Sequence, residues 1–348
     1  MRRRHPARPK EAELLETRQV PSTPPSVKLP RHASSGGRLR GLRAGITLAI
    51  VVGVFSLAAG TMAAGDPNPY DLVEVNPEEG RPAAPEPRAQ QEEFIERRKV
   101  PLRDGMLRIP GGEFFMGYDG PLPHEANEVP AHLVHVDPFW IDVHEVTVEE
   151  MRGCVDRGQC KLRLGRGPAC TLERGDPKLP VNCVPWQSAD AYCRIMRKRL
   201  PTEAEWELAA GGGLHLRFPW GTVAPSCRLA VTLLSNRAGV SCDPHGPSPV
   251  ATHSRGASYF GVEDMAGNVE EWVADWYADR YEVRAAQEQM VASPVGPAFG
   301  VAHVLRGGGW MSRPREARVT ARNWGSPNEA GPNVGFRCAK DDIGEPKP

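Results

Sequence analysis

An uncharged run of 21 residues, Ala44 to Ala64, divides the chain into two unequal parts (AGITLAIVVGVFSLAAGTMAA). At about 1.5 Å rise per residue, a helix of this length spans the roughly 30 Å hydrocarbon core of a bilayer. Arg38, Arg40 and Arg43 lie just before the run, and the first charge after it is Asp66. The positive-inside bias therefore predicts a single-pass protein with a cytoplasmic N-terminus and its larger part on the other side.

A cleaved signal peptide is the alternative explanation of this run, because small residues end it. The 43 residues that precede the run are longer than the usual basic start of a signal peptide, which favours an anchor. No cysteine near Ala64 could carry a lipid. We expect residues 44–64 to stay in the membrane as a transmembrane helix.

The segments on both sides of this run differ in composition. Residues 1–43 are rich in Arg, Pro and Ser and carry eleven Lys/Arg against three Asp/Glu, which predicts a disordered basic tail. Residues 65–103 are rich in Pro and Glu and predict a stiff linker, with room for a short helix around 90–98. The folded domain is expected over 104–342, with a tail at 343–348. Because the chain has no net charge, the part after the tail is mildly acidic, and no nucleic-acid partner is expected.

All eight cysteines follow the apolar run. An even number of cysteines in an oxidising compartment predicts disulfides. A zinc site is the rival interpretation, but the chain has no C-x-x-C pair and no histidine at ligand spacing from a cysteine.

The residue pattern of the expected folded domain predicts short strands and helices separated by many turns. Strands are expected in LRIPGGEFFMG and AHLVHVDPFWIDVHEVT, and helices from Thr147, from an N-cap at Ser188, and from Thr202. Thr202 and Glu205 can form a capping box, and the glycines at 211–213 can end that helix. With 36 Gly and 35 Pro, the chain is too rich in loops for a Rossmann fold or a barrel.

Five segments, in this order, resemble the sulfatase-modifying-factor (formylglycine-generating enzyme) family. They are IPGGEFFMG, EVTVEEM, LPVNCVPWQSADAYC, RLPTEAEWELAA with FPWG, and GVEDMAGNVEEWVADWY followed by VLRGGGWMS and NVGFRC. The resemblance covers about two-thirds of the chain, and RLPTEAEWE, GNVEEW and the closing GFRC are specific in this order. It implies an α+β domain, irregular and loop-rich, with a C-type-lectin-like core.

The resemblance also implies a disulfide between Cys193 and Cys338, where the family has one. The family's second bridge maps to Ala209 and Val319, so both of its halves are missing here. The other six cysteines are not family features. We expect Cys227 to pair with Cys242 across one insertion and, among three possible connectivities of the rest, Cys154 with Cys160 and Cys170 with Cys183.

A structural calcium ion is implied at the segment that matches one family site. There the ligands would be the Asp264 and Glu271 side chains and the Gly267 and Val269 carbonyls, hard oxygens of the kind that Ca²⁺ prefers. The alternative is that Asp264 caps the turn and Glu271 makes an ion pair. A second family calcium site lacks its Asn, because Val231 follows Leu229-Ala230.

The catalytic cysteines of the family are absent. The enzyme binds copper with two thiolates just after its Gly-Gly-Ser loop, and Cu(I) requires such soft ligands. In this chain the first cysteine position holds Ser312, and the second falls within Arg313–Arg318, which contains no cysteine. Gly309 replaces the loop serine and Glu270 replaces an active-site Trp. Copper and the family's oxidation of a cysteine are therefore not expected.

A binding surface for a protein, peptide or glycan is the remaining expectation for this region. It would be lined by Trp310, Arg313, Arg315, Arg318, Arg322 and Asn323, since arginine recognises carboxylates and phosphates in two-bond geometry. The alternative is that these arginines solvate a loop and pair with acidic groups. The sequence favours a periplasmic binding or scaffold module in the bacterial inner membrane, against a formylglycine-generating oxidase or a structural envelope protein.

Overall fold

The computed structural model describes residues 100–234, 241–281 and 291–342. All of them belong to the larger of two compact units into which the chain divides, Ala64–Pro348. The predicted basic tail, the membrane segment 44–64, the helix around 90–98 and the tail at 343–348 lie outside the described residues. In the part that is described, no helix is both long and apolar enough to cross a membrane.

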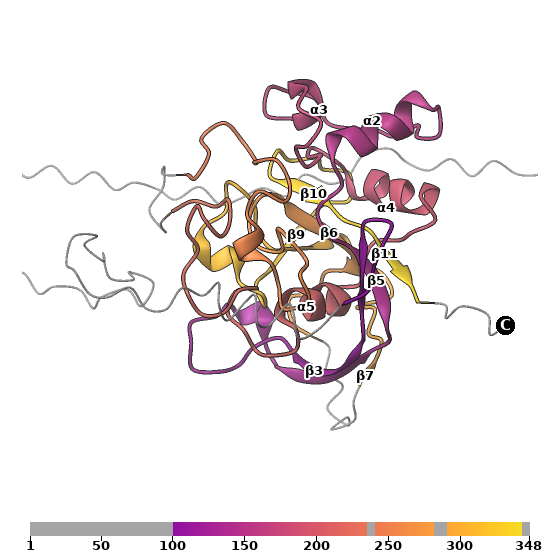
Figure 1. Cartoon of the computed structure of the whole chain (residues 1–348). Coiled ribbons are helices and arrows are strands. Elements are labelled where there is room, and N and C mark those ends of the chain that lie inside the picture. Colours follow the sequence, from indigo (N-terminus) through magenta and orange to yellow (C-terminus); the bar gives the residue numbers. More distant parts are fainter. Residues whose placement is uncertain (1–99, 235–240, 282–290, 343–348) are drawn as a thin grey trace, which may run out of the picture. The chain divides into compact units, whose positions relative to one another are not determined.

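One four-stranded sheet joins the beginning and the end of the domain (Figure 1). Its order is β1 (Leu102–Arg103), β2 (Met106–Ile109), β5 (Phe139–Asp142) and β11 (Ala339–Asp341), and all neighbours are antiparallel. The strand β1 lies within the predicted linker 65–103, so regular structure begins earlier than predicted. Asp104 and Gly105 have φ of 51° and 73°, as in a two-residue hairpin turn that pairs β1 with β2.

Two further sheets complete the strand structure. The second has the order β10 (Val334–Phe336), β6 (Glu270–Trp276), β8 (His303–Arg306) and β9 (Arg322–Gly325), with β10 parallel to β6. The third has the order β3 (Gly112–Met116), β4 (His132–Val136) and β7 (Val291–Ala292). The strands expected around residues 106–116 and 132–142 are therefore present.

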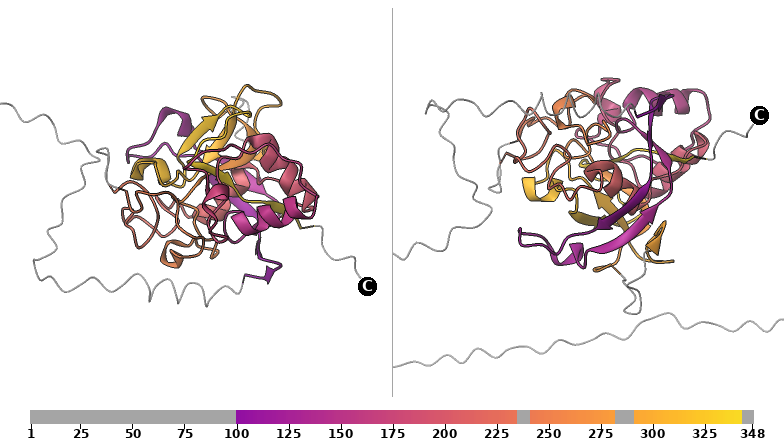
Figure 2. Two further views of the ribbon diagram at one scale, coloured as in Figure 1. Left: turned by 90° about the horizontal axis from the view of Figure 1, so that it is seen from above. Right: turned by 60° about the horizontal axis from the view of Figure 1, so that its bottom comes forward.

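The helices are short, and one of them lies at the centre of the domain (Figures 1 and 2). They are α2 (Val148–Asp156), α3 (Thr171–Arg174), α4 (Trp186–Ile195) and the central α5 (Glu203–Gly211). The described residues also contain the 3₁₀ turns η1 (Ala126–Glu128), η2 (Ser254–Gly256) and η3 (Pro314–Ala317), which lie in other connections. Mixed short strands and helices in long irregular connections are the α+β architecture that was expected.

The predicted capping box at Thr202 is present, and the helix predicted to start at Thr147 has one as well. The Thr202 hydroxyl accepts from the Glu205 N–H at 3.2 Å, and a Glu205 carboxylate oxygen accepts from the Thr202 N–H at 2.8 Å. The same capping box joins Thr147 and Glu150 at the start of α2. The Gly212 residue, at φ 65°, ends α5 in the left-handed conformation.

The predicted N-cap at Ser188 is wrong. Helix α4 begins two residues earlier, at Trp186, with Pro185 as its N-cap. Ser188 is buried in the first turn, and its hydroxyl donates to the Arg163 carbonyl at 2.6 Å. The proline, at φ −64°, is already set for the chain to enter a helix, so the side chain of Ser188 is free to hold the preceding loop.

The apolar interior consists of two clusters on either side of the central elements. The first gathers residues of β2 to β5 around Trp206 of α5. The second gathers α2 and α4 around Trp272 of β6 and Phe336 of β10. Burial of both aromatic-rich clusters supplies the main driving force for this loop-rich fold.

Four disulfides reinforce the domain, and all eight cysteines take part. The Cys193–Cys338 bridge joins α4 to the residue before β11 across 145 residues of sequence. The other bridges are local and confirm the predicted pairing: Cys154–Cys160, Cys170–Cys183 and Cys227–Cys242. The Cys154–Cys160 and Cys170–Cys183 bridges lie at the two ends of the connection between α2 and α4, so both of its ends are held in place.

Candidate functional site

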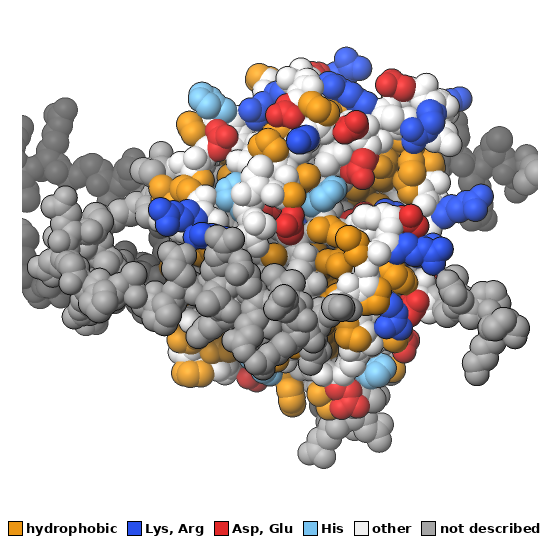
Figure 3. Space-filling model, viewed as in Figure 1, with side chains coloured by type: hydrophobic (Ala, Val, Ile, Leu, Met, Phe, Trp, Pro, Cys, Tyr) orange, Lys and Arg blue, Asp and Glu red, His pale blue; other side chains and the backbone are white. Residues whose placement is uncertain are grey.

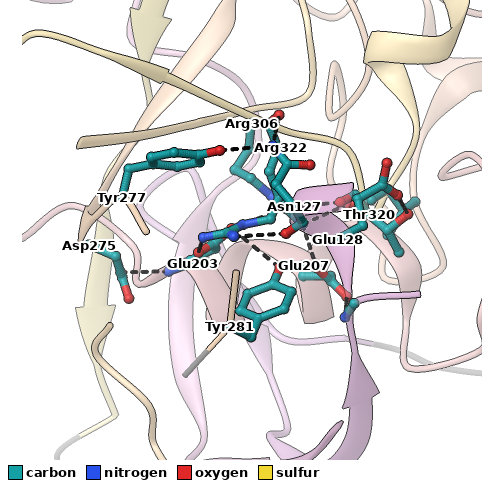
Figure 4. Close-up of polar contacts among 12 residues, drawn as sticks. Asn127, Glu128, Glu203, Glu207, Asp275, Tyr277, Tyr281, Arg306, Thr320 and Arg322 are labelled. Carbon is teal, nitrogen blue, oxygen red and sulfur yellow. Dashed lines mark hydrogen bonds and ion pairs between the residues drawn. The ribbon is translucent and has the colours of Figure 1, made fainter. Parts of the chain in front are cut away.

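Helix α5 carries a buried ionic network to the centre of the domain (Figure 4). The Glu203 carboxylate accepts from Arg322 at 2.6 and 3.0 Å and from Arg306 at 3.2 Å. One turn further on, Glu207 also pairs with Arg306. All four side chains are buried, so each charge depends on its partner for stability.

Two arginines that were expected on a binding surface belong to this interior instead. Arg322 is 8% exposed and pairs with Glu203, while Arg318 is 3% exposed and pairs with both carboxylate oxygens of Glu128. The prediction of an accessible surface is therefore wrong for Arg318, and Arg322 reaches only the wall of a cavity, beside its partner Glu203. A buried guanidinium needs a carboxylate beside it, and each of these has a structural one, 119 and 190 residues away in the sequence.

A cavity of about 400 Å³ adjoins the network, with Glu203, Asp275, Tyr281 and Arg322 in its wall. The Asp275 carboxylate accepts from the Glu203 N–H at 2.8 Å. Burial, and then the neighbouring Glu203 carboxylate, raise the pKa of Asp275 to about 8. The ion pairs of the network itself join two glutamates, 203 and 207, to two arginines, 306 and 322.

The glycine loop that follows β8 is folded tightly against α5. Gly307 and Gly308 have φ of 85° and 60°. The Ser312 side chain is buried, and its oxygen accepts from the Gly309 N–H at 2.9 Å and from Asn333 Nδ2 at 3.1 Å. A Cβ at Gly309 would come within 2.4 Å of Asn333 Oδ1, so a larger residue at this position would displace Asn333.

The donors around Ser312 do not suit a copper ion. They are a hydroxyl, a backbone amide and a side-chain amide, whereas Cu(I) prefers thiolates. Every cysteine of the chain lies in the described part, and none is free. Met311 is half exposed and offers a single thioether.

A cavity of about 440 Å³, which we call the Glu270 cavity, opens close to this loop. Glu270 begins β6 and is 5% exposed, and one of its oxygens accepts from Asn323 Nδ2 at 2.9 Å. No cationic side chain of the described residues makes an ion pair with it. Burial raises the pKa of Glu270 to about 7. The Asn323 hydrogen bond opposes this rise, and the nearby Glu316 carboxylate contributes to it.

The other residues expected on a binding surface are dispersed. Trp310 is half-buried, and its indole N–H donates to the Pro332 carbonyl at 3.0 Å. Arg313 and Arg315 are half-buried on η3 and just before it. Only Asn323 of the predicted set lines the Glu270 cavity.

The sequence pointed to Glu270 only as the replacement of an active-site Trp of the family, and did not predict it as a residue of a binding site. Trp324 and Glu329, which also line the Glu270 cavity, were missed. The signal available was the pair Glu270-Glu271 at the start of a buried strand, because successive residues of a strand face opposite sides. Only one of the two side chains could therefore make an interior ion pair, and the other had to point to the opposite side of the strand.

The predicted calcium loop contains a surplus of buried negative charge. Glu271 pairs with Arg337 at 2.7 and 2.8 Å and also accepts from Trp206 Nε1 at 2.9 Å. Glu145 lies beside the same loop, where its oxygens are 3.4 Å from Asn268 Nδ2 and the Val269 N–H. Burial, and then the Asp264 carboxylate, raise the pKa of Glu145 well above its usual range.

Glu271 makes the ion pair of the alternative prediction, with both of its oxygens accepting from Arg337. Three buried carboxylates, Glu145, Asp264 and Glu271, have one nearby guanidinium, that of Arg337. One Asp264 oxygen accepts from the Ala251 N–H at 3.0 Å. Within the described ranges, no group of three or more His, Cys, Asp or Glu side chains is arranged to hold a metal, so the predicted site depends on its two backbone carbonyls.

Comparisons with known proteins agree with this fold and loop arrangement. Residues 91–342 match the family model described as the sulfatase-modifying factor enzyme 1-like domain. The formylglycine-generating enzyme of Streptomyces coelicolor is 33% identical over 311 residues, which cover 74% of this chain and 96% of that protein. The structure of PvdO from Pseudomonas aeruginosa is similar with a TM-score of 0.56 and 27% identity, covering 68% of this chain and 94% of that one.

A second kind of relative is a much longer protein. The serine/threonine-protein kinase pkn1 of Chlamydia pneumoniae is 34% identical over 303 residues, which cover 82% of this chain. The match covers only 43% of that kinase, so the chain spans less than half of its length. Together with the family model, which covers more than half of the chain, these similarities show that the protein belongs to the sulfatase-modifying-factor (formylglycine-generating enzyme) family.

Proposed function

We propose that this family member is a binding module and not an oxidase. The observation that carries the proposal is Ser312, whose oxygen is held by Gly309 and Asn333 where the family enzyme has its first copper-binding cysteine. A hydroxyl at this position has a pKa far above neutrality and is a hard donor, so it cannot replace a thiolate on Cu(I). The eight cysteines are all committed to disulfides and supply no substitute.

The Glu270 cavity supports the positive half of this proposal. It lies next to the catalytic loop of the family, and its wall includes the exposed Trp324 and the unpaired Glu270. Clefts that combine apolar surface with a few directed polar groups are the usual sites of ligand binding.

A direct assay separates binding from oxidation. The full-length chain is incubated with Cu(I) and a peptide that carries a sulfatase cysteine motif, and formylglycine is measured by mass spectrometry. The Streptomyces coelicolor enzyme serves as the positive control. We expect no formylglycine and no copper retained by the purified chain. Formylglycine produced by the chain at a rate near that of the control would refute the proposal.

We also propose that residues 44–64 anchor the domain in the bacterial inner membrane, with the domain in the periplasm. The proposal is supported by the charge asymmetry around the apolar run and by four disulfides, which persist in oxidising compartments. Tags at both termini test it. Recovery of both tags in one membrane-bound chain supports an anchor, whereas loss of the N-terminal tag from a released domain supports cleavage.

A structural calcium ion at the loop of residues 264–271 is the third proposal. The ion would be held by Asp264, Glu271 and the carbonyls of Gly267 and Val269, and it would offset the surplus charge that includes Glu145. Its function would be to fix the loop that leads into β6 and therefore into Glu270. Metal analysis of the purified chain, before and after chelation, tests for it directly.

A further inference from the structure

A second cavity adjoins the Glu270 cavity, and the charged side chains that line it are positive instead of negative. It has a volume of about 600 Å³ and is lined by Lys161, Arg163, Pro185, Ser188 and Asn328, among others. Ala330 lines both cavities, so the two meet at the loop before β10. We call the pair of cavities the two-ended groove.

The cationic end belongs to a connection that the disulfides hold in place. Residues 157–166 (RGQCKLRLGR) contain four Lys or Arg and no carboxylate. Lys161 and Arg163 are exposed, and neither makes an ion pair within the described part of the chain. The Cys154–Cys160 and Cys170–Cys183 bridges limit how far this connection can move. The positive charges are therefore held at a fixed place, with no ion-pair partner among the residues that the structure describes.

The face in Figure 3 shows the surroundings of this connection. Lys and Arg side chains lie over α2 and α3, where they alternate with acidic, polar and apolar ones. The visible described surface of this face has no extended basic area of the kind that holds a nucleic acid. The cations of the groove are thus a local feature suited to one or two negative charges.

The anionic end is a buried carboxylate without a counter-ion. Glu270 is 5% exposed, accepts one hydrogen bond from Asn323 and faces the cavity with no cation beside it. Glu329, in the same wall, and Glu316 add negative charge nearby. Burying an unpaired charge is unfavourable, and a ligand cation placed in the cavity removes that cost.

Apolar residues line both cavities beside the charged groups. Leu305, Val334 and Ala330 line one cavity, and Leu162, Pro185 and Ala191 line the other. A ligand that fits both cavities carries a cation, an anion and apolar surface. An extended peptide provides all three from neighbouring side chains.

We propose that the two-ended groove binds an extended peptide segment, with a Lys or Arg side chain at Glu270 and an Asp or Glu side chain at Lys161 and Arg163. This inference rests on the proposed function of the domain as a binding module, and it identifies the class of partner. Lys161 and Arg163 lie outside the five segments whose motifs resemble the family.

The test uses a random peptide library and the full-length chain kept in detergent. Peptides retained by the chain are sequenced, and the best binders are labelled with fluorescein for titration. We expect a basic and an acidic residue at a fixed separation, with apolar residues between them. Binding should weaken as salt concentration rises, because both contacts are ionic.

Three variants separate the two ends of the groove. Glu270→Gln keeps the shape and the Asn323 bond, and we expect a loss of roughly tenfold or more for peptides that carry the basic residue. The double variant Lys161→Glu with Arg163→Glu should do the same for the acidic residue. The matched control, Lys178→Glu with Arg197→Glu, makes the same change of charge at exposed residues outside both cavities and should bind normally.

The outcomes distinguish this inference from the proposed function. Peptides that bind equally well to Glu270→Gln and to the Lys161/Arg163 double variant overturn the groove but leave a binding module in place. Selection of no peptide at all also overturns the groove. Formylglycine formation in the copper assay overturns the binding-module proposal itself, whatever the library shows.

Discussion

The guanidinium of Arg337 lies against the carboxylate of Glu271 in a two-bond contact inside the domain. The two bonds measure 2.7 and 2.8 Å, and neither side chain is more than 1% exposed. Arg337 also donates to the backbone carbonyls of Asp142, Val143 and Glu263. One side chain therefore connects the C-terminal segment to β5, to Glu263 just before the loop of residues 264–271, and to β6.

Replacing Arg337 should destabilise the domain strongly. Arg337→Met leaves the Glu271 carboxylate buried without a cation, and three carbonyls lose a donor. Loss of one partner of a buried ion pair costs about 3–5 kcal/mol in unfolding free energy. Thermal and denaturant unfolding measure the change. Lys340→Met, on the exposed face of β11, is the control and should change the stability little; an equal loss in both variants would contradict the role of the pair.

The long disulfide should contribute more than the short ones. Loop-entropy arguments give about 5 kcal/mol for closing the 145-residue loop of Cys193–Cys338 and about 2 kcal/mol for the 6-residue separation of Cys154–Cys160. We therefore expect Cys193→Ala with Cys338→Ala to lower the unfolding temperature more than Cys154→Ala with Cys160→Ala. The two double variants are compared by calorimetry. The reverse order would show that local packing dominates over chain entropy.

Glu270 should make the stability depend on pH. Burial raises its folded pKa to about 7, from an ordinary value of 4.5 in the unfolded chain. The folded state therefore binds more protons between these values, and its stability falls as the pH rises through this window. Glu270→Gln removes the effect: we expect it to match the wild type near about pH 5 and to exceed it by at most about 3 kcal/mol near about pH 8.

The measurement is the unfolding free energy of both proteins across this pH range. A constant difference between Glu270→Gln and the wild type would mean that the carboxyl titrates as it does in the unfolded chain. Asn323→Ala provides a second comparison. It removes the hydrogen bond that lowers the pKa, so the loss of stability should then begin to level off at a higher pH.

Chelation should lower the thermal stability if calcium occupies the loop of residues 264–271. An ion present at one hundred times its dissociation constant stabilises the folded state by about 2.7 kcal/mol. We expect EDTA to lower the unfolding temperature and added Ca²⁺ to restore it. Asp264→Ala should abolish this response, whereas Asp243→Ala, a carboxylate outside the loop, should retain it. A wild-type chain that is indifferent to EDTA and contains no calcium would argue against the site.

A single cysteine at the family position should not restore copper binding. Ser312→Cys places one thiol between Gly309 and Asn333, but the segment 313–318 supplies no second one. One thiolate is insufficient for the two-thiolate coordination of the family enzyme. Copper analysis and the formylglycine assay check this expectation. Restored oxidation in this variant alone would show that the second thiolate is dispensable.

Local chemistry in the sequence determined several parts of this fold. The capping boxes at Thr147 and Thr202 depend on residues three positions apart, so both helix starts could be predicted from neighbouring letters. The alternation of apolar residues predicted β2 to β5, and the order of the motifs predicted the α+β core. The Ser188 cap failed because Pro185 offered an earlier start, and the hairpin at Asp104-Gly105 was overlooked.

The tertiary structure alone decided which charged groups are free. In the sequence, nothing distinguishes Arg318 and Arg322 from Arg313. In the structure, the first two form ion pairs with acids more than one hundred residues away. Glu270 and Glu271 are adjacent, but the fold supplies a guanidinium to one and a cavity to the other. Burial and charge pairing arise from contacts between segments that lie far apart in the sequence. Neighbouring residues therefore do not reveal them. The identity of the missing thiolates was readable from the sequence; the groove was not.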